Sequence, residues 1–358
     1  MWDTIVAGAG PAGAVASLVL ASKKFKVLLI DGTPPEHKVG EALPGVGLRI
    51  LRLLGLPVPT RDGPHRPISG NLSSWDSEEL VPTDFVRDPD GPAWRLDRIC
   101  FDVTLRESAI RSGVTFEMAR VLEVTRQQNI WQVFSSDGTV QAAPWLIDAT
   151  GRRAAIASRA GARRKRDAGL IALYALGKPT DECYTNRTVV EAVPKGWWYV
   201  AILPSRIPIA GLHVRPQEAF YISGNETAWR QALLETRHVA QIFADSNIDQ
   251  LLRPLDASGG RLDHFAGDGW IACGDAALSF DPLSSQGILS ALHGGMKAGL
   301  AVAAALSGDL GQLASYTSAL EEIRRTYVTR VQQVYCGETR WRFEPFWSSF
   351  HRCQENKE

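Results

Sequence analysis

Residues 1–31 constrain the fold of this chain more than any other stretch. They read as a strand from Trp2 to Ala7, the glycine turn GAGPAG, a helix of small residues, and a second strand, Lys26 to Ile30. A strand, a glycine turn, a helix and a strand in this order are typical of dinucleotide-binding α/β folds. The competing interpretation is a glycine-rich connection in an ordinary α/β domain. The pattern predicts a parallel sheet with a nucleotide at its carboxyl edge.

Each glycine of the turn has a physical task in such a site. Gly8 allows the tight turn, Gly10 lets the backbone approach a pyrophosphate, and Gly13 lets helix and strand pack closely. The helix N-terminus directs unpaired N–H groups at the phosphates. Asp31, at the end of the second strand, can accept hydrogen bonds from an adenosine ribose. The predicted contacts of this unit also include Pro11, Ala12 and Gly32.

The composition is that of a soluble globular protein, with 45% apolar and 22% charged residues. Lysine plus arginine balances aspartate plus glutamate at 39 each, so overall charge favours neither a nucleic-acid nor a membrane partner. The longest small-apolar run, Ala298 to Leu306, is too short to span a bilayer. Five scattered cysteines without a CxxC pair suit a reducing compartment and predict no metal site. We therefore expect a cytoplasmic protein.

Hydrophobic periodicity places further elements along the chain. It predicts helices over Pro44–Leu54, Trp94–Ser112, Gln286–Leu306 and Gln312–Val334. It predicts strands over Val114–Thr125, Ile130–Ser135 and Thr139–Ile147, with a hairpin at Asp137–Gly138. An edge strand is expected near Leu72–Trp75. From Gly169 to Val214 several strands follow one another without helices, which is typical of an antiparallel sheet.

Two more glycine motifs follow apolar strands: DATGRR, Asp148 to Arg153, and GDAALSFDPLSSQG, Gly274 to Gly287. Ligands in open parallel sheets bind beyond the carboxyl ends of the strands, so the three motifs belong to one site. In this order they resemble the fingerprints of FAD-dependent aromatic hydroxylases and halogenases, which are glutathione-reductase-like flavoproteins. The resemblance implies an α/β chain: a Rossmann-like FAD-binding domain, an inserted antiparallel-sheet substrate domain, and C-terminal helices.

The resemblance also sets the expected domain boundaries. Residues 1–68, 93–168 and 256–310 would form a discontinuous FAD-binding domain. Residues 69–92 and 169–255 would form the substrate domain, and residues 311–358 a C-terminal helical segment.

The family implies further FAD contacts. Glu41 and Arg98 match its FAD-contacting positions, Asp275 would bond the ribityl chain, and the helix from Gln286 would direct its positive end at the flavin pyrimidine edge. Simpler interpretations are a surface helix acid for Glu41, a helix-surface ion pair for Arg98 and an N-cap for Asp275. The remaining implied contacts are Val121, Asp148, Gly151, Gly274, Pro282, Gly287 and Ile288.

Tryptophan halogenases of this superfamily usually carry a WxWxIP segment and a catalytic lysine and glutamate. Here the corresponding segment is GWWYVAILP, Ser284 stands where those halogenases have the glutamate, and no lysine lies in SSWDSEE, Ser73 to Glu79. The sequence therefore argues against halogenation.

GWWY, SSW, DPLSSQGI and RWRFEPFW look more like the flavoproteins that mature cysteine tryptophylquinone enzymes. That branch implies monooxygenation of an indole ring through a flavin hydroperoxide, with dioxygen as co-substrate and a tryptophan of a precursor quinoprotein as substrate. NAD(P)H or an external reductase would supply electrons, because the chain has no second GxGxxG region. Small-molecule hydroxylases could share these strings. Two alternatives remain: a flavin-dependent reductase of isoprenoid double bonds, and a non-catalytic flavoprotein chaperone.

No catalytic residue is assigned, but four side chains are candidates for the substrate pocket: Trp198, Tyr199, His213 and Ser285. Strand alternation sends Trp198 to one face of its sheet and Trp197 and Tyr199 to the other. We expect the Trp198 face to line the cavity; packing alone is the alternative for all three. The aromatic tail with Trp341 and Trp347 is either a helix docked in a groove or a wall of the entry channel. Seven basic residues between Arg152 and Arg166 read as a solvated face, or as a docking surface for an acidic partner or an NADPH phosphate.

Overall fold

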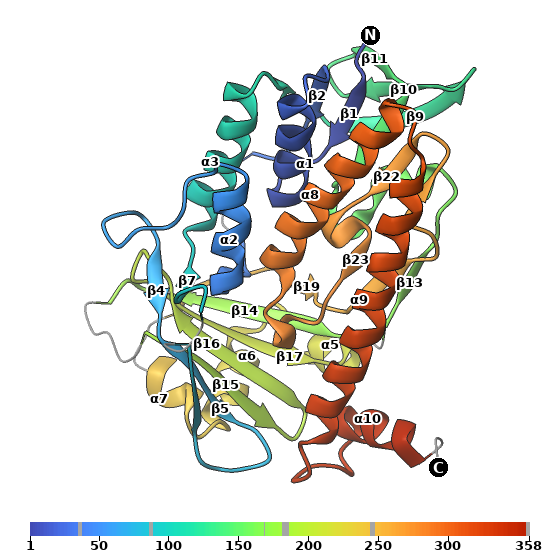
Figure 1. The fold of residues 1–358 in the computed structure, drawn as a ribbon. Coiled ribbons are helices and arrows are strands. Elements are labelled where there is room, and N and C mark those ends of the chain that lie inside the picture. The colour runs from blue at the N-terminus through green and yellow to red at the C-terminus, as the bar shows by residue number, and fades with distance from the viewer. Residues whose placement is uncertain (35–37, 86–88, 168, 181–185, 244–247, 356–358) are drawn as a thin grey trace. The chain divides into compact units, whose positions relative to one another are not determined.

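A computed structural model describes residues 1–34, 38–85, 89–167, 169–180, 186–243 and 248–355 (Figure 1). The chain divides into two compact units. Unit 1 contains Met1–Val58, Arg98–Asp167 and Gly259–Thr326. Unit 2 contains Pro59–Asp97, Ala168–Ser258 and Tyr327–Glu358. Unit 2 therefore includes three stretches that were expected in the FAD-binding domain, residues 59–68, 93–97 and 256–258. The expected C-terminal segment, residues 311–358, divides between the two units after Thr326.

Unit 1 is built on a six-stranded sheet in the order β21-β22-β12-β1-β2-β8. Its strands are β1 (Thr4–Ala7), β2 (Val27–Ile30), β8 (Thr115–Glu117), β12 (Trp145–Asp148), β21 (Ala266–Gly267) and β22 (Trp270–Ala272). All neighbours run parallel except β21 and β22. Strands β1, β2 and β12 are fully buried, as expected of a parallel sheet covered on both faces. The predicted α/β fold class is confirmed.

The register places the three glycine motifs at one edge of this sheet. Ala7 pairs with Ile30 and with Asp148, and Asp148 pairs with Ala272. The turns that follow β1, β12 and β22 therefore begin at the same level of the sheet.

The helices of unit 1 are α1 (Pro11–Ser22), α2 (Gly45–Leu53), α3 (Arg98–Arg111), α4 (Ala155–Arg159) and α8 (Gly287–Leu306), and α9 (Gly311–Cys336) begins there. Helices α1 and α8 lie side by side (Figure 1). They approach closely because glycines of α8 face α1: a Cβ at Gly295 would lie 2.2 Å from the Ala12 carbonyl oxygen, and one at Gly299 2.8 Å from that of Ala16. By length and composition α8 could cross a membrane, but 56% of its most apolar window is buried, and α8 packs on α1.

Two small antiparallel sheets complete unit 1. One contains β9 (Val121–Gln127), β10 (Ile130–Ser135) and β11 (Val140–Ala143), and the other β13 (Arg164–Arg166), β20 (Gly260–Leu262) and β23 (Leu278–Ser279). The hairpin at Asp137–Gly138 is confirmed, with Gly138 at φ +83°. The strands predicted over Val114–Thr125 and Thr139–Ile147 each divide in two, β8 with β9 and β11 with β12.

Unit 2 is built on a larger sheet in the order β18-β14-β17-β16-β15-β5-β6. Its strands are β5 (Gly70–Ser74), β6 (Val81–Asp84), β14 (Ile171–Gly177), β15 (Thr188–Val193), β16 (Gly196–Ile202), β17 (Pro208–Val214) and β18 (Ile248–Leu251), with β19 (Leu255–Asp256) also pairing with β14. Neighbours are antiparallel except β15 and β5. The strand expected near Leu72–Trp75 is present as β5, but it does not lie at the edge of the sheet, because β6 pairs with its outer side.

Helices α5 (Pro216–Ile222), α6 (Glu226–Leu234) and α7 (Val239–Phe243) contribute to a hydrophobic core with β14, β15, β16 and β17. The expected helix over Trp94–Ser112 is wrong at its start, because Ala93–Arg95 is strand β7, which pairs with β4 (Arg66–Ile68), and α3 begins only at Arg98. The chain ends in α10 (Pro345–Glu355).

Candidate functional site

The turn after β1 is held by backbone contacts that only glycine permits. Gly8 has φ +101°, and a Cβ there would lie 2.3 Å from the carbonyl oxygen of Ala149. A Cβ at Gly13 would lie 1.8 Å from the carbonyl oxygen of Gly8. The GAGPAG turn, the first turn of α1 and the DATGRR turn are therefore packed backbone to backbone.

Open space lies beside three other glycines at this edge. A Cβ at Gly10, Gly151 or Gly287 would meet no atom within 4 Å. Helix α1 begins after Gly10 and α8 after Gln286, and neither N-terminus has a side-chain cap. Uncapped helix N-termini offer backbone N–H groups and a positive dipole end to an anion or an electron-rich ring. Glycine-lined space beside two such ends fits a dinucleotide cofactor.

Asp31 closes the turn from the second strand. Its carboxylate accepts hydrogen bonds from the Ala9 and Thr33 backbone N–H groups, each at 2.7 Å. A carboxylate has about four acceptor positions, so capacity remains for ribose hydroxyls. Gly32 lies against Arg120, where a Cβ would be 2.3 Å from the Arg120 Cγ, and Val121 begins β9 next to it.

The carboxylate of Asp148 is engaged by the turn and the helix that follow it. Its side chain is fully buried, and Oδ2 accepts from the backbone N–H groups of Ile156 and Ala157, both at 2.8 Å. Oδ1 accepts from the N–H and the hydroxyl of Thr150. Burial raises the pKa of Asp148, and these hydrogen bonds oppose that shift. The Asp148 side chain therefore caps α4 and fixes the turn that carries Gly151, and its place among the FAD contacts stays a prediction.

Asp275 lies in a single 3-10 turn, Gly274–Ala276, directly after β22. Its Oδ2 is 3.5 Å from Nε of Arg152, and the side chain is 35% exposed. Burial raises the Asp275 pKa, while Arg152, Arg164 and Arg98 act in the opposite direction. The N-cap interpretation is wrong, because Cys273 holds that position in the turn and Asp275 caps no helix.

Two arginines of the basic run donate hydrogen bonds to backbone carbonyls of the segment from Asp275 to Phe280. Arg152 donates to the carbonyl of Phe280 at 2.9 Å, and Arg164 donates to the carbonyl of Asp275 at 3.0 Å. Arg164 also donates to the Ser279 hydroxyl. The solvated-face interpretation of the basic run is therefore wrong for Arg152 and Arg164.

Glu41 is buried and Arg98 is largely buried, and both are hydrogen-bonded to the backbone of Gly40. Glu41 is 2% exposed, and its Oε2 accepts from the Gly40 N–H at 2.8 Å. Arg98 donates to the Gly40 carbonyl at 2.7 Å and forms a two-point ion pair with Asp102, which also binds Lys38. Glu41 is thus not a surface helix acid. The Arg98–Asp102 pair exists, but with the Arg98 side chain 11% exposed it anchors residues 38–41 rather than decorating the helix surface.

The loop before α8 is a tight structure. The Asp281 carboxylate accepts from the Leu283 N–H at 2.9 Å, Pro282 begins a 3-10 turn, and Ser285 has φ +51°. A non-glycine residue in the left-handed region carries backbone strain, and such residues cluster at functional sites. Ser285 and Gly287 are exposed, whereas Ile288 is buried at the start of α8.

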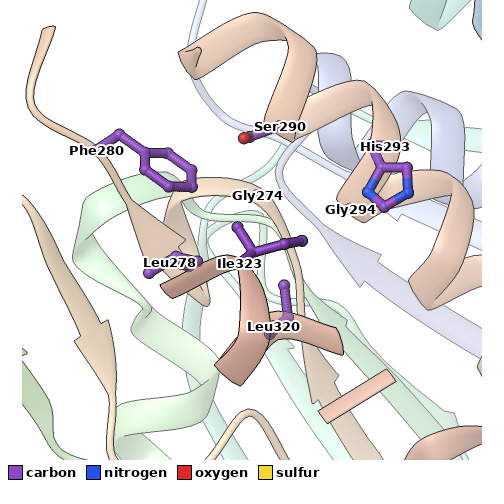
Figure 2. A pocket seen from close by; sticks show the side chains of 8 residues that line it. All are labelled: Gly274, Leu278, Phe280, Ser290, His293, Gly294, Leu320 and Ile323. Carbon is purple, nitrogen blue, oxygen red and sulfur yellow. The ribbon is translucent and has the colours of Figure 1, made fainter. Parts of the chain in front are cut away.

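A pocket lies behind this loop within unit 1 (Figure 2). Ser290 and His293 of α8 reach it from one side, and apolar side chains close the other sides. Burial and the nearby Lys297 lower the His293 pKa, so the imidazole is neutral at neutral pH. The lining consists of Gly274, Leu278, Phe280, Ser290, His293, Gly294, Leu320 and Ile323.

In unit 2 the two faces of the central sheet differ sharply. Trp198 is 1% exposed and packs edge-on against Trp229 at 5.0 Å, inside the core shared with α6 and α7. The expectation that Trp198 lines the substrate cavity is therefore wrong, because helices cover its face. The opposite face carries Trp197, Tyr199 and His213.

That opposite face is a polar aromatic cluster. Tyr174 shares a 3.1 Å hydrogen bond with Nε2 of His213, and Arg95 donates to the hydroxyls of Tyr199, at 3.2 Å, and Thr188, at 3.1 Å. Burial lowers the His213 pKa to about 3, so its ring is neutral at physiological pH. The sequence pattern did not identify Tyr174 or Arg95. Alternation along β14 could have indicated Tyr174, but Arg95 lay inside a stretch predicted as helix.

The aromatic tail is docked against unit 2. Trp347 is 0% exposed and donates from its indole nitrogen to the Val193 carbonyl at 2.9 Å. Glu338 is buried, pairs with Arg340 and accepts from the Asp76 N–H at 2.8 Å. Of the two interpretations left open, the docked helix is the one observed. Within the described residues, no group of three or more His, Cys, Asp or Glu side chains could hold a metal ion.

Comparisons with known proteins agree with this geometry. A family model for tryptophan halogenase matches residues 83–358. The putative FAD-dependent oxidoreductase LodB of Marinomonas mediterranea is 28% identical over 98% of this chain and 97% of its own. A 1H-pyrrole-2-carbonyl peptidyl-carrier-protein brominase of Pseudoalteromonas luteoviolacea is 26% identical over 86% of this chain and 79% of its own.

A solved structure extends the likeness in fold. The peptidyl tryptophan dihydroxylase QhpG, described as essential for tryptophylquinone cofactor biogenesis, superposes with a TM-score of 0.81 at 22% identity, covering 98% of this chain and 78% of that one. The fold and the glycine turns define an FAD-dependent, halogenase-like flavoprotein. Because the family model covers most of its length, the chain belongs to the tryptophan halogenase family.

Proposed function

We propose that the protein is an FAD-dependent monooxygenase that hydroxylates an indole ring, the side chain of a tryptophan in a precursor protein during cysteine tryptophylquinone formation. The similarity to LodB over both full lengths supports this branch, and the shared fold of QhpG, named a peptidyl tryptophan dihydroxylase, is consistent with it. Dioxygen is the proposed co-substrate, with NAD(P)H or an external reductase as the electron source.

The observation that carries the proposal is the position of the lysines in unit 2. Among its described residues the lysines are Lys178 and Lys195, and both are exposed. A halogenase lysine is expected in the segment Ser73–Glu79. That segment is instead held by the end of α9 and the residues after it: Trp75 donates to the Val334 carbonyl, and the Asp76 carboxylate accepts from the Thr339 N–H. Without a buried lysine to position a hypohalous acid, direct oxygen transfer is the simpler chemistry.

The chain's own residues have clear tasks in this proposal. The N-terminus of α1 beside Gly10 would hold the pyrophosphate, Asp31 the adenosine ribose and Asp275 the ribityl chain. The N-terminus of α8 beside Gly287 would stabilise negative charge on the flavin ring. The open space at both glycines supports this assignment. When bound and reduced, FAD supplies the activation of dioxygen.

In unit 2, the partly exposed Tyr199 is the proposed substrate-facing side chain. His213 was also a candidate, but it is 1% exposed and lies behind Tyr199, against Tyr174 and Trp197. An indole is electron-rich enough to be attacked without a strong base. This agrees with a His213 whose lowered pKa keeps it neutral and whose Nε2 is engaged by Tyr174. Arg95 holds the Tyr199 hydroxyl and so fixes its ring. Ser285, at the strained turn before α8, is the proposed substrate-side residue of unit 1.

The test is co-expression with a candidate precursor quinoprotein and mass spectrometry of its tryptophans. We expect one tryptophan to gain oxygen only when FAD, reductant and dioxygen are all present; FAD-depleted protein is the control. The family and the brominase relative favour halogenation as the second candidate. A halogen isotope pattern on an indole product in the presence of bromide or chloride would overturn hydroxylation. Turnover without dioxygen on an isoprenoid would favour the reductase, and partner binding without any product would favour the chaperone.

A further inference from the structure

A continuous line of tyrosine and tryptophan side chains begins on the polar face of the unit 2 sheet. Tyr199 and Tyr174 meet edge to face at 6.5 Å, and Tyr174 is hydrogen-bonded to His213. The Tyr174 ring lies across strand β17 at Gly211, where a Cβ would be 2.2 Å from the ring. The absence of a side chain at Gly211 is what lets Tyr174 reach both neighbours.

The middle of the line is fully buried. His213 stacks on Trp197 with ring centroids 3.6 Å apart and planes 3° from parallel. The Trp197 indole N–H donates to the Tyr335 hydroxyl at 2.9 Å. Trp197, His213 and Tyr335 are each 1% exposed. Water therefore does not interrupt this part of the line.

The line ends near the surface. The Tyr335 ring meets Trp75 edge-on at 5.9 Å, and the partly exposed Trp75 donates its indole N–H to the Val334 carbonyl. Trp347, fully buried, branches from Trp75 at 5.3 Å. Every member belongs to unit 2.

Tyrosine and tryptophan are among the side chains that lose one electron most readily, and electron transfer is fast between rings in contact. Burial alone would be served equally by phenylalanine or leucine. Here two pairs of neighbouring rings are joined by hydrogen bonds: the Tyr174 phenol to the His213 imidazole, and the Trp197 indole to the Tyr335 phenol. The first of these hydrogen bonds provides a place, Nε2 of His213, for the proton that Tyr174 must release when it is oxidised.

We propose that this line is an electron relay that carries oxidising equivalents from the polar sheet face to Trp75, where solution reductants remove them. The proposal rests on the proposed function, because dioxygen activation without a substrate yields partially reduced oxygen species. Such a one-electron oxidant takes an electron from Tyr174, whose phenolic proton moves to Nε2 of His213. Trp197 returns the electron to Tyr174, and the proton moves back.

The remaining steps restore the relay. Trp75 reduces the Trp197 radical cation through Tyr335, which contacts both, and the indole protons stay in place. A thiol or ascorbate in solution then reduces Trp75. In sum, the oxygen species gains one electron, the thiol or ascorbate loses one, and no side chain is consumed.

The test uses the full-length protein and azide radicals made by pulse radiolysis, which oxidise tryptophan by one electron. In the native chain we expect tryptophan radical absorbance, formed at the exposed Trp75 end, to convert to tyrosyl radical absorbance as the line is traversed in the reverse direction. The conversion should be a fast phase whose rate does not depend on protein concentration. Tyr335→Phe should lose that phase, because Tyr335 is the tyrosine in contact with Trp75. Trp198→Phe, on the face of the sheet opposite to Trp197, should keep it.

Equal behaviour of the two variants would overturn the relay. If Tyr335→Phe fails to fold, Trp75→Phe at the partly exposed end serves as the second variant and should also lose the phase. A further readout is peptide mapping after aerobic turnover of the FAD-loaded protein without substrate. Oxidation should mark Trp75 in the native chain and Tyr174 or Tyr199 in Trp197→Phe. Radiolysis needs no turnover, so a failure of the proposed function would leave that part of the test intact.

Discussion

Gly10 and Gly13 stand three residues apart in one turn, yet the structure gives them opposite sensitivities. Gly10 has φ −69° and open space beside it, so Gly10→Ala should change the free energy of unfolding of the FAD-free protein by less than about 0.5 kcal/mol. It should weaken FAD binding by roughly tenfold, because the added methyl keeps the pyrophosphate from the backbone. Fluorescence titration with FAD measures the affinity, and urea unfolding measures the stability.

Gly13→Ala is the matched comparison. Its Cβ would lie 1.8 Å from the Gly8 carbonyl oxygen, so the turn has to open, at a cost of about 1–3 kcal/mol even without FAD. If Gly10→Ala bound FAD as tightly as the native chain, the pyrophosphate would not lie beside Gly10.

His213 makes unit 2 sensitive to acid. Its pKa is about 3 in the folded protein against an ordinary 6.5, so below pH 6.5 the unfolded chain binds a proton that the folded chain excludes. Stability is complete above pH 6.5 and is lost as the pH falls toward 3. At pH 5 the loss amounts to about 2 kcal/mol. Urea unfolding at pH 7 and pH 5, followed by tryptophan fluorescence, measures it.

His213→Gln keeps a hydrogen-bonding group for Tyr174 but cannot titrate, so its unfolding free energy should fall less between pH 7 and pH 5. His264→Gln is the control, since the His264 side chain is 48% exposed. An unchanged pH dependence in His213→Gln would show that the buried imidazole does not carry it.

Two residues show where single-sequence reasoning stops at this scale. Alternation correctly placed Trp198 and Trp197 on opposite faces, but it could not tell which face α6 and α7 cover, since that depends on packing between distant segments. Asp148 was recognised as part of a glycine motif, but spacing could not show that its carboxylate accepts from the backbone of α4, which follows it. Spacing locates a motif without fixing where each side chain points.

At the scale of elements, the close packing of α8 against α1 depends on glycines of α8. Gly295→Ala would place a methyl 2.2 Å from the Ala12 carbonyl oxygen and force the two helices apart. We expect a loss of about 1–3 kcal/mol in the free energy of unfolding. Gly287→Ala, in the first turn of the same helix with no atom within 4 Å, should unfold like the native chain. Equal stabilities of the two variants in urea would contradict this account of the packing.

The long, strongly periodic helices were predicted well because their signal is local. Gln286–Leu306 and Pro44–Leu54 match α8 and α2 to within one residue at each end. The short strand Ala93–Arg95 was missed, since three residues carry no period and become a strand only by pairing with Arg66–Ile68. Short elements defined by a distant partner lie beyond what a local pattern can show.

At the scale of the molecule, the α/β class and the meeting of three glycine turns could be predicted, because the carboxyl ends of parallel strands share one edge. The division of the chain into two units could be predicted only in outline, without the correct boundaries. The boundary between the units falls within α9, between Thr326 and Tyr327, because side chains that follow, such as Tyr335 and Glu338, have their partners in unit 2. No periodicity within a continuous helix marks such a change.

The division into units leads to a prediction for cofactor binding. All the FAD contacts proposed here lie in unit 1, so FAD should stabilise that unit by about 2.7 kcal/mol at a hundredfold excess over its Kd. Hydrogen exchange should slow most in residues 8–13, 149–153 and 285–290, which carry the open glycines and the helix N-termini. The amides of β14 and β17 in unit 2 serve as the internal reference and should change little. Protection spread evenly over both units, or confined to unit 2, would mean that the glycine turns do not hold the cofactor. Gly10→Ala should show the same pattern at a higher FAD concentration, because the substitution changes the affinity and not the site.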